Sequence, residues 1–379
     1  MEFQLNEEQS KLQSAARELA RKEIGPAAAA VDEAEEFAMD NFKKMAALGF
    51  TGLLIPPQYG GIGGDMVGTV AVMEEIAQAC ASTADILNAH LILGARPVLL
   101  NGTAEQKKKY LPPLASGSKI GAFAITEADA GSDISGAKST AVKEGDSYVI
   151  NGCKVFITNG PACDIMIIFA GIPALAPRGM TAFIVESSAP GFSRSTPYVK
   201  VGMHGGTNCK LIFENARIPA SDRLGDEGKG MKICLYTLDE GRICIAAQAV
   251  GIGQAVLDHA VAHAKERRQF GRPIGDNQAI QWKLVDMDLK VQAARLLTYH
   301  AASLLDNKLS FSREAARAKL FASDSSMEIA VDGMQVCGGY GYMMDSPMQR
   351  YFRDAKLTQI YEGTSEVQRM VISRALLTA

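Results

Sequence analysis

The hydrophobic period changes twice along the chain, and this change constrains the fold more than any other feature. Residues 1–120 carry the signals of helices, residues 121–228 place apolar side chains at every second position, and residues 229–379 return to the helical period. No helices alternate with the strands of the middle segment, so a parallel, doubly wound sheet is disfavoured. The sequence predicts an α+β protein with an N-terminal helical domain, a central antiparallel β-barrel or sandwich and a C-terminal four-helix bundle.

Two helix starts and one loop stand out in the N-terminal domain. Asn6 and the run Thr103–Gln106 have the residue types of helix caps. The loop at 55–64 is rich in glycine and proline, but it lacks a preceding strand, the spacing of a dinucleotide fingerprint and a Walker lysine. These glycines alone are therefore weak support for nucleotide binding.

The middle domain contains alternating stretches that are bounded by turn residues. The pair Asn151-Gly152 suits the tight turn of a hairpin, and it separates the alternating runs 147–150 and 154–158. Further strands are expected at 164–169, 181–185 and 210–213. We therefore expect a hairpin that turns at Asn151-Gly152, followed by at least three more strands.

The C-terminal domain should consist of long helices. Apolar stripes and stop signals predict helices over about 231–268, 278–305, 312–337 and 365–377. Gly338-Gly339 ends the third of them. Long helices joined by short loops pack as an antiparallel bundle.

Composition and charge exclude several classes of protein. A net charge of −3, with 47% apolar and 21% charged residues, fits a globular protein and argues against a nucleic-acid binder. No apolar run approaches the length that we expect of a membrane span, and we expect no signal or transit peptide before the first helix signal. Seven scattered cysteines indicate reduced thiols in an intracellular protein. His259 and His263 lack a third ligand, so no metal is expected. We expect a bacterial cytoplasmic protein, with a mature mitochondrial-matrix protein as the alternative.

Glu362 is the candidate catalytic residue. It follows the apolar pair Ile360-Tyr361 and precedes Gly363, so a sharp turn can present its carboxylate from an apolar surface. Such surroundings disfavour the charged form and raise the carboxyl pKa toward the range of a general base. The alternative is a surface glutamate just before the last helix.

A second candidate segment, Phe123–Asp133, lies where the helical domain meets the β domain. It combines small residues, which let a ligand approach the backbone, with hydroxyl groups at Thr126 and Ser132. Read from composition alone, this segment is a polar loop that can contact a ligand.

Both segments resemble motifs of the acyl-CoA dehydrogenase family, and the resemblance covers essentially the whole chain. The run Asp354–Gln368 is similar to the family's catalytic segment, and Phe123–Asp133 to its flavin loop, with Ala128 where the family usually has proline. Phe156 stands where many members have tryptophan. The chain is most similar to short-chain, butyryl-CoA-type members and to acryloyl-CoA reductase-type members.

The resemblance implies FAD as cofactor and assigns contacts to it. The implied FAD-binding residues are Phe123, Ile125, Thr126, Gly131, Ser132, Phe156, Ile157, Thr158, Arg267, Gln269, Phe270, Gln278, Gln335, Val336, Gly338, Gly339, Thr364 and Glu366. The implied substrate-binding residues are Ser132, Asp239, Arg242, Tyr361 and Gly363. Because Arg267, Gln278 and Gln335 match positions that reach a neighbouring subunit's flavin, the resemblance also implies a homotetramer built as a dimer of dimers.

The reaction implied is α,β-dehydrogenation of an acyl-CoA, with the electrons passing to electron-transferring flavoprotein. Glu362 would take the α-proton while a hydride leaves the β-carbon for flavin N5. The family stabilises the enolate through the backbone N–H of the base and a ribityl hydroxyl of FAD. Some relatives carry the base just before the arginine, where this chain has Gly241.

Three alternatives remain open at this stage. The enzyme could work in reverse as an enoyl-CoA reductase, it could be a different flavoenzyme such as an oxidase, or the fold could be a scaffold without catalysis. We expect a short acyl chain or a compact ring because of the likeness to butyryl-CoA-type and acryloyl-CoA-type members. We expect it to be uncharged because Ala84 falls where glutaryl-CoA enzymes carry a carboxylate-binding arginine. Asp85 is either a second acid for cyclic substrates or a helix-end aspartate, and His90 is either a pocket residue or a packed helix histidine.

Overall fold

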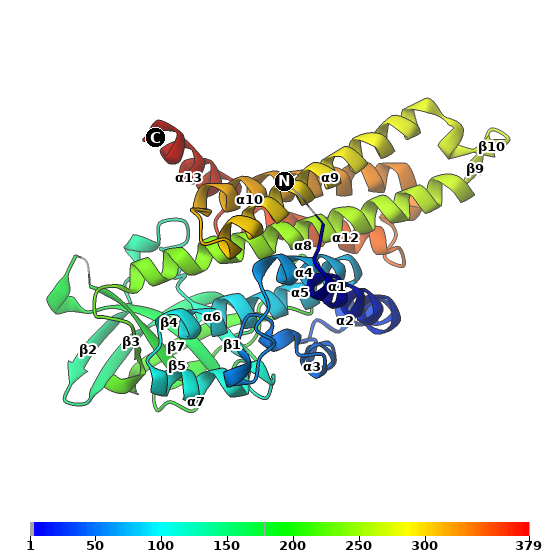
Figure 1. Cartoon of the computed structure of the whole chain (residues 1–379). Helices are drawn as coiled ribbons and strands as arrows, with labels where there is room; N and C mark the ends of the chain where they lie inside the picture. Colours follow the sequence, from blue (N-terminus) through cyan, green and yellow to red (C-terminus); the bar gives the residue numbers. More distant parts are fainter. Residues whose placement is uncertain (1–3, 178, 379) are drawn as a thin grey trace.

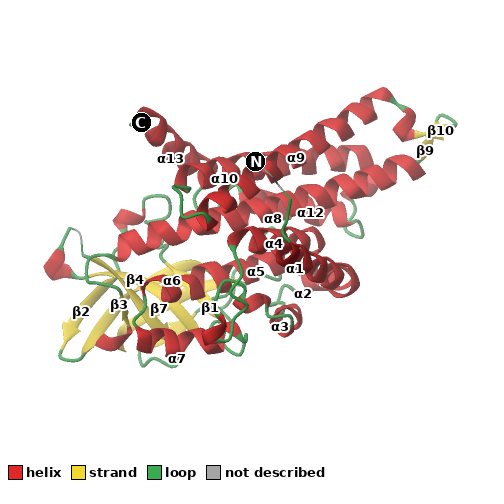
Figure 2. Cartoon of the chain, in the orientation of Figure 1, coloured by secondary structure: helices red, strands yellow, loops and turns green. Residues whose placement is uncertain are grey.

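The computed structural model describes residues 4–177 and 179–378. Figures 1 and 2 show three parts: a cluster of N-terminal helices, a sheet beside them, and long C-terminal helices that lie across both. One continuous set of buried apolar side chains runs through all three parts. The three predicted segments are therefore present, but they share a core.

The N-terminal part is a packed set of helices. Its α-helices are α1 (Glu7–Leu19), α2 (Gly25–Ala34), α3 (Met39–Ala47), α4 (Met66–Ala79), α5 (Ala81–Asn88), α6 (Arg96–Asn101) and α7 (Ala104–Ala115). Both predicted caps are confirmed, because Asn6 and Thr103 each form a capping box with the residue three positions later. Between α5 and α6 the chain continues as a π-helix, η4 (Ala89–Ala95), a form that is frequent at functional sites.

The sheet is mostly antiparallel. Its strands are β1 (Gly121–Ala124), β2 (Thr140–Glu144), β3 (Ser147–Thr158), β4 (Ile165–Gly171), β5 (Met180–Glu186), β6 (Phe192–Arg194), β7 (Asn208–Pro219) and β8 (Arg223–Leu224). They follow the order β6-β7-β3-β2-β4-β5-β8. β1 departs from the antiparallel expectation, because it pairs parallel with β4, from Gly121 opposite Ile165 to Ala124 opposite Ile168. This pairing is possible because the β2–β3 hairpin separates the two strands in sequence.

The predicted turn at Asn151-Gly152 is wrong. β3 runs without a break through both residues, and the hairpin turns instead at Gly145-Asp146, where Glu144 pairs with Ser147. The register against β7 shifts between Ile150 and Gly152, so the glycine marks a β-bulge. A β-carbon at Gly152 would lie 2.1 Å from Ser139 Oγ, so only glycine fits this bulge.

The C-terminal part consists of long helices, as predicted. They are α8 (Gly230–Glu266), α9 (Gln278–Asp306), α10 (Ser312–Cys337), α11 (Gly339–Tyr342), α12 (Pro347–Thr358) and α13 (Ser365–Leu377), with the short strands β9 (Arg268–Gln269) and β10 (Arg272–Pro273) between α8 and α9. Helix α12, which begins at Pro347 after its cap Ser346, was not predicted from the sequence. The four predicted helices end within two residues of their expected positions.

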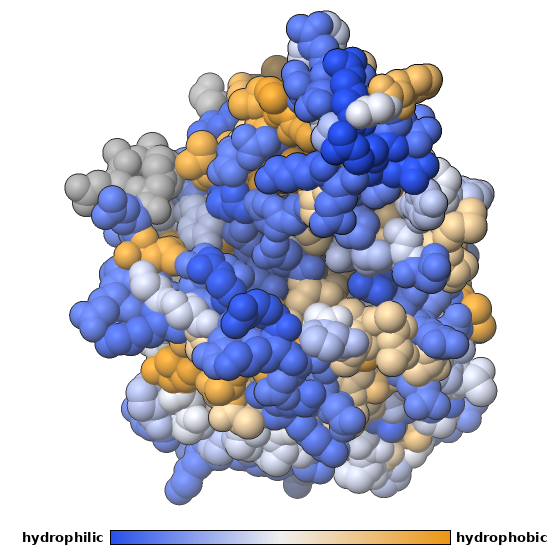
Figure 3. All heavy atoms as spheres, turned by 90° about the vertical axis from the view of Figure 1, so that its right-hand side faces the viewer, coloured by the Kyte–Doolittle hydropathy of each residue, from blue (hydrophilic) through white to orange (hydrophobic). Residues whose placement is uncertain are grey.

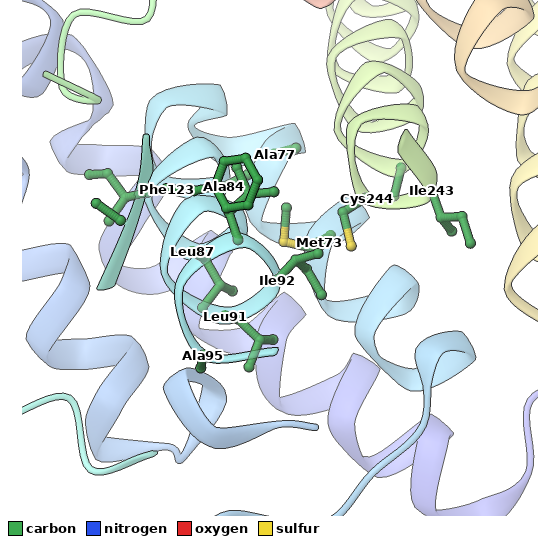
Figure 4. Packing of buried hydrophobic residues seen from close by; sticks show 14 of the residues in the cluster. Met73, Ala77, Ala84, Leu87, Leu91, Ile92, Ala95, Phe123, Ile243 and Cys244 are labelled. Atoms are coloured by element: carbon green, nitrogen blue, oxygen red, sulfur yellow. The ribbon is translucent and has the colours of Figure 1, made fainter. Parts of the chain in front are cut away.

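Helix α8 is long and apolar enough to cross a membrane by length and composition, contrary to the sequence expectation. However, 83% of its most apolar window is buried inside the chain. It packs against α4, α9 and α10. In Figure 4, Cys244 of α8 lies beside Met73 of α4, and Phe123 of β1 lies beside the turn of α5 that carries Ala84. The apolar surface of α8 is thus explained by the core that it completes.

Candidate active site

Glu362 lies in the tight turn that joins α12 to α13. Its φ is +50°, and that of Gly363 is +94°, so two consecutive residues have left-handed backbone. This conformation is uncommon for a residue with a side chain, and it costs about 1–3 kcal/mol where the surroundings enforce it. The sharp turn that the sequence predicted is therefore present, and it positions the Glu362 side chain at the expense of local stability.

The turn is held by groups from the inside of the protein. The Gly363 carbonyl accepts hydrogen bonds from Lys319 Nζ at 2.7 Å and from Gln368 Nε2 at 2.8 Å. The N–H of Ser365 closes the turn by donating to the carbonyl of Gln359 at 3.0 Å. Lys319 and Gln368 are completely buried. These contacts enforce the strained backbone at Glu362.

The two carboxylate oxygens of Glu362 have different surroundings. Oε1 accepts a hydrogen bond from Asn88 Nδ2 at 2.6 Å. Oε2 is buried and has no hydrogen-bond partner among residues 4–177 and 179–378. It points at Gly241 of α8, where a β-carbon would lie only 2.0 Å from it. The absence of a side chain at position 241 therefore makes room for the carboxylate.

The pKa of Glu362 is raised to about 8. Burial is the main cause, and the nearby carboxyl of Asp85 raises it further. The hydrogen bond from Asn88 and the positive charges of Lys319 and Arg242 act in the opposite direction. A carboxyl group with such a pKa can take up and release a proton near neutral pH. This was expected from the apolar neighbours in the sequence.

Tyr361 is fixed beside the base and cannot act as an acid. Its hydroxyl donates to Gln248 Oε1, and burial raises its pKa well above the ordinary value. Gln248 is itself buried and also donates to the carbonyl of Ala81 at 2.8 Å. Tyr361 therefore forms part of the rigid wall of the site.

Asp239 and Arg242 form an ion pair across one turn of α8. Arg242 is 5% exposed, and its Nε has no hydrogen-bond partner among the described residues. A β-carbon on Gly363 would lie 3.8 Å from Arg242 Nη2. The structure thus brings this pair to the same turn as Glu362.

The loop after β1 is attached to β3 by a buried ion pair. Lys154 Nζ donates to Glu127 Oε1 at 2.7 Å and to the carbonyl of Ile125 at 3.2 Å. The N–H of Val155 donates to the carbonyl of Thr126 at 2.9 Å. These bonds join the two segments in which the family resemblance implies flavin contacts. Lys154 and Glu127 were not predicted.

The predicted flavin residues divide into buried and open ones. Phe123, Ile125 and Ile157 are buried. Gly131 and Ser132 are exposed, and a β-carbon on Gly131 would meet no atom within 4 Å. The buried residues therefore support the surface on which the open ones lie.

Phe156 is the most conspicuous of the open residues. Its ring is 64% exposed and its φ is +59°. It lies 5.1 Å from the ring of Tyr198, centroid to centroid. The hydroxyl of Thr158, two residues farther along β3, accepts from Asn208 Nδ2 at 2.8 Å. An exposed aromatic ring on a strained backbone marks a surface for a ligand rather than a packing contact.

A second set of predicted residues lies around a groove at the far end of the bundle. The groove has a volume of about 520 Å³ and includes Arg267, Gln269, Val336, Gly338 and Gly339 in its lining. Figure 1 places β9 and β10, next to this groove, at the end of the helices remote from the sheet. One chain therefore does not bring this set together with Phe156.

Three further predicted residues near this end are exposed. They are Phe270 at the tip of the β9–β10 hairpin, Gln278 at the start of α9 and Gln335 near the end of α10. The ring of Phe270 is 99% exposed. Figure 3 looks onto this end of the molecule, where hydrophilic side chains predominate and apolar ones form separate patches.

Thr364 and Glu366 lie on the outer side of the catalytic turn. Thr364 caps α13 by accepting from the N–H of Val367 at 3.3 Å. Both residues line a groove of about 430 Å³ together with Ile360 and Arg369. They are thus beside Glu362, but on a different surface from its carboxylate.

Several residues around the base were not predicted from the sequence. They lie on helices whose other residues are apolar or of mixed polarity: Asn88, Lys319, Gln248 and Gln368. Lys319 could have been noticed, because it interrupts the small and apolar residues of α10. Asn88 carried no such sign, and its contact with Glu362 spans 274 positions of the chain.

His90 and the pair His259/His263 have no catalytic arrangement. His90 is fully buried, donates to the carbonyl of Leu114 and accepts from the N–H of Gly121, both at 3.0 Å. Burial lowers its pKa to about 4, so it is a neutral packing residue. The described residues contain no group of three metal-ligating side chains.

Comparison with known proteins gives matches along the whole chain. Three family models match in sequence order: the acyl-CoA dehydrogenase N-terminal domain at residues 6–118, the middle domain at 122–216 and the C-terminal domain at 228–377. The short-chain-specific acyl-CoA dehydrogenase of Clostridium acetobutylicum is 45% identical over 98% of this chain and 99% of its own length. Acryloyl-CoA reductase (NADH) of Anaerotignum propionicum is 44% identical over 100% of this chain and 96% of its own length.

Solved structures agree with these sequence matches. A chain from a study of the electron transferring flavoprotein of Acidaminococcus fermentans has a TM-score of 0.98 and 44% identity, and the match covers both chains completely. An acyl-CoA dehydrogenase from Bacillus anthracis, solved in complex with FAD, has a TM-score of 0.94 and 32% identity, covering 99% of this chain and 67% of that one.

Proposed function

Since the chain belongs to the acyl-CoA dehydrogenase family of oxidoreductases, we propose that it is an FAD-dependent enzyme that dehydrogenates a short-chain or compact cyclic acyl-CoA to the trans-2-enoyl-CoA. The observation that carries this proposal is the geometry of Glu362. Its carboxylate is presented on a strained turn, opposite Gly241, with a pKa of about 8. This is the arrangement of a general base for a weakly acidic proton.

The residues of the chain fit FAD as the cofactor. Phe156 offers an exposed ring, and the open space at Gly131 leaves the backbone free to approach a ligand. Thr126 and Thr158 lie on the two segments that Lys154 and Glu127 hold together. These residues would hold the flavin, and the groove at Arg267 and Gly338 would hold the distant part of a second FAD. When bound, FAD supplies the acceptor for the hydride that leaves the β-carbon.

In the proposed mechanism the Glu362 carboxylate takes the α-proton of the acyl thioester. Its own backbone N–H donates no hydrogen bond among the described residues, so it is available for the thioester carbonyl. Such a donor stabilises the charge that develops on the carbonyl oxygen. Lys319 and Gln368 keep the turn in place, so the N–H and the carboxylate hold a fixed relation.

The acyl pocket should be small and should lack a site for a terminal carboxylate. Ala84, Leu87 and Leu91 on the α5–η4 helix are buried and apolar. No basic side chain stands at Ala84, so a buried anionic end of an acyl group would remain unpaired. The similarity to the short-chain-specific enzyme of Clostridium acetobutylicum also supports a short acyl group as the substrate.

We further propose a homotetramer that passes its electrons to electron-transferring flavoprotein. Arg267, the groove beside it and the exposed Gln278 lie remote from Phe156, so their predicted flavin contacts require a second copy. Trp282 and Leu289 on α9 are 60% and 61% exposed, which leaves an apolar stripe for another subunit to cover. The likeness to a chain studied with an electron transferring flavoprotein supports the partner.

The reverse reaction is the second candidate. The 44% identity to acryloyl-CoA reductase (NADH) favours a reductase of short 2-enoyl-CoA substrates. Glu362 would then return a proton to the α-carbon. The same residues serve both directions, because the proton transfer is reversible.

One set of assays tests the proposed function. The purified protein should be yellow and should elute as a tetramer. It should oxidise butyryl-CoA with electron-transferring flavoprotein faster than octanoyl-, palmitoyl- or glutaryl-CoA. Reduction of crotonyl-CoA faster than oxidation of butyryl-CoA would assign the reverse direction. A colourless protein, a rapid reaction of the reduced enzyme with oxygen, or a preference for palmitoyl- or glutaryl-CoA would contradict the proposal.

A further inference from the structure

Asn208, at the start of β7, is a buried amide that contacts the bulge of β3. Phe156 lies in this bulge, because the register of β3 against β7 shifts between Lys154 and Ile157. Asn208 Nδ2 donates to the carbonyl of Phe156 at 3.3 Å and to the hydroxyl of Thr158 at 2.8 Å. Both amide hydrogens of Asn208 are therefore used by the strand that carries these two predicted flavin residues.

The amide oxygen of Asn208 is held by Lys200, in the loop before β7. Lys200 Nζ donates to Asn208 Oδ1 at 2.7 Å, to the carbonyl of Met203 at 2.8 Å and to the carbonyl of Gly206. An ammonium group donates three hydrogens and accepts none, so the contact with Lys200 fixes which atom of the amide faces it. Turning the amide over would place Nδ2 against the ammonium group and Oδ1 against two oxygens. The amide of Asn208 therefore has one orientation.

This orientation decides the direction of the hydrogen bond at Thr158. Because the Thr158 oxygen accepts from Asn208 Nδ2, the hydroxyl hydrogen points away from that bond. The hydrogen has no acceptor among residues 4–177 and 179–378. Thr158 is half-buried, whereas Asn208 is buried, so a ligand can reach the hydroxyl but not the amide behind it. The hydroxyl of Thr158 is thus arranged to donate to a ligand.

The oxidised flavin ring of FAD matches such a donor. Its polar edge consists of ring nitrogens and carbonyl oxygens that accept hydrogen bonds, with a single N–H donor between two carbonyl groups. A hydroxyl that directs its hydrogen outward binds an acceptor on this edge. A hydroxyl that presents its lone pairs instead leaves two acceptors facing each other, which weakens binding.

We propose that Asn208 and Lys200 are positioning residues, which set the hydroxyl of Thr158 as a donor to an acceptor atom of bound, oxidised FAD. Lys200 fixes the amide, the amide occupies a lone pair of the Thr158 oxygen, and the hydroxyl hydrogen is left for the flavin. The second amide hydrogen holds the carbonyl of Phe156, whose backbone is left-handed at φ +59°. One side chain therefore supports both residues. The inference rests on the proposed function, which supplies FAD as the ligand.

Asn208→Asp tests the proposal, because it reverses the hydrogen bond while the shape of the side chain is kept. A carboxylate has no hydrogen to donate, so the Thr158 hydroxyl turns toward it and presents lone pairs to the ligand. Titration of the apoprotein with oxidised FAD should show binding that is weaker by about tenfold or more, and the visible absorption bands of the bound flavin should shift. Asn215→Asp makes the same change of charge at an exposed position of β7 and should leave both measurements unchanged.

A double-mutant cycle separates this role from general support of the sheet. Thr158→Val keeps the shape of the side chain but removes the hydroxyl, and it should also weaken FAD binding by about tenfold. Thr158→Ser keeps a hydroxyl and should bind FAD nearly as the wild type does. In the Thr158→Val background, Asn208→Asp should have almost no further effect, because no hydroxyl remains to be turned.

Two results would overturn the proposal. One is an Asn208→Asp variant that binds FAD as tightly as the wild type. The other is a double variant in which the two effects multiply, since Asn208 would then act only on the fold. If Asn208→Asp does not fold, Asn208→Ala replaces it in the cycle and is judged by the same two results. Its expected effect is smaller, about threefold, because the hydroxyl is then free to rotate. A wild type that takes up no FAD would instead count against the proposed function.

Discussion

Gly241 of α8 faces the carboxylate of Glu362 so closely that a β-carbon at position 241 would lie 2.0 Å from Oε2. Gly241 and Glu362 are far apart in sequence, but in the folded chain the carboxylate of Glu362 fits against the bare backbone of Gly241. The carboxylate can occupy this position only because α8 has no side chain at residue 241.

Gly241→Ala should displace the Glu362 carboxylate and lower kcat by more than tenfold. The added methyl group also overpacks a rigid site, so the free energy of unfolding should fall by about 1–3 kcal/mol. Turnover and urea denaturation measure the two effects. Gly253→Ala, on the same helix with only side-chain neighbours at 3.3 Å or more, should keep normal turnover. Equal kcat values for both variants would contradict the steric argument.

Glu362→Gln should retain FAD and acyl-CoA binding but lose nearly all turnover. The amide has almost the shape of the carboxylate, but it cannot accept the α-proton. Removing a general base typically lowers the rate by about 10²–10⁴-fold. Stopped-flow reduction of the flavin by butyryl-CoA measures the step directly. Glu214→Gln, an exposed glutamate on β7, is the control. A Gln variant with normal flavin reduction would remove Glu362 from the mechanism.

Asn88→Ala should move the pH dependence of kcat/KM to higher pH. In the wild type, activity should rise with pH through about 8, as Glu362 loses its proton. The hydrogen bond from Asn88 favours the charged carboxylate, so its loss raises the pKa of Glu362. The pH profile of both proteins checks the sign. A shift toward lower pH would show that Asn88 does not stabilise the carboxylate.

Lys319→Met should destabilise the catalytic turn and also disfavour the charged form of Glu362. The Gly363 carbonyl loses its bond to Nζ, and the pKa of Glu362 rises because a nearby positive charge disappears. We expect lower kcat at pH 7 that partly recovers at pH 9. Lys283→Met, which removes the pairing of a partly exposed lysine with Asp332, is the control. A kcat loss that does not depend on pH would mean that Lys319 acts only by holding the turn.

The stability of the protein should fall as pH rises from about 4.5 to about 8, partly because of Glu362. Its folded pKa of about 8 exceeds the ordinary glutamate pKa of 4.5, so the folded state binds more protons in this window. Stability then decreases with pH until the folded state also loses the proton. Glu362→Gln should make this decline shallower. Urea titrations of both proteins at pH 5, 6.5 and 8 measure the difference, and parallel curves would contradict the raised pKa.

The amino-acid sequence alone was enough to predict the division into helical, β and helical segments, because the periods 3.6 and 2 are local properties of the chain. It also determined the capping boxes at Asn6 and Thr103 and most of the helix ends, since caps act within a few residues. Glu362 could be singled out from its neighbours Tyr361 and Gly363 and from the family motif that surrounds it.

The surroundings of Glu362 could not be predicted from the sequence, because they come from distant segments. Asn88 from α5, Gly241 from α8 and Lys319 from α10 converge on one carboxylate, and no local pattern records contacts over such separations. The bulge at Gly152 could likewise not be predicted, because an Asn-Gly pair is compatible with both a tight turn and a bulge. The chemistry of the site depends on burial and on charges from distant segments, and these exist only once the chain has folded.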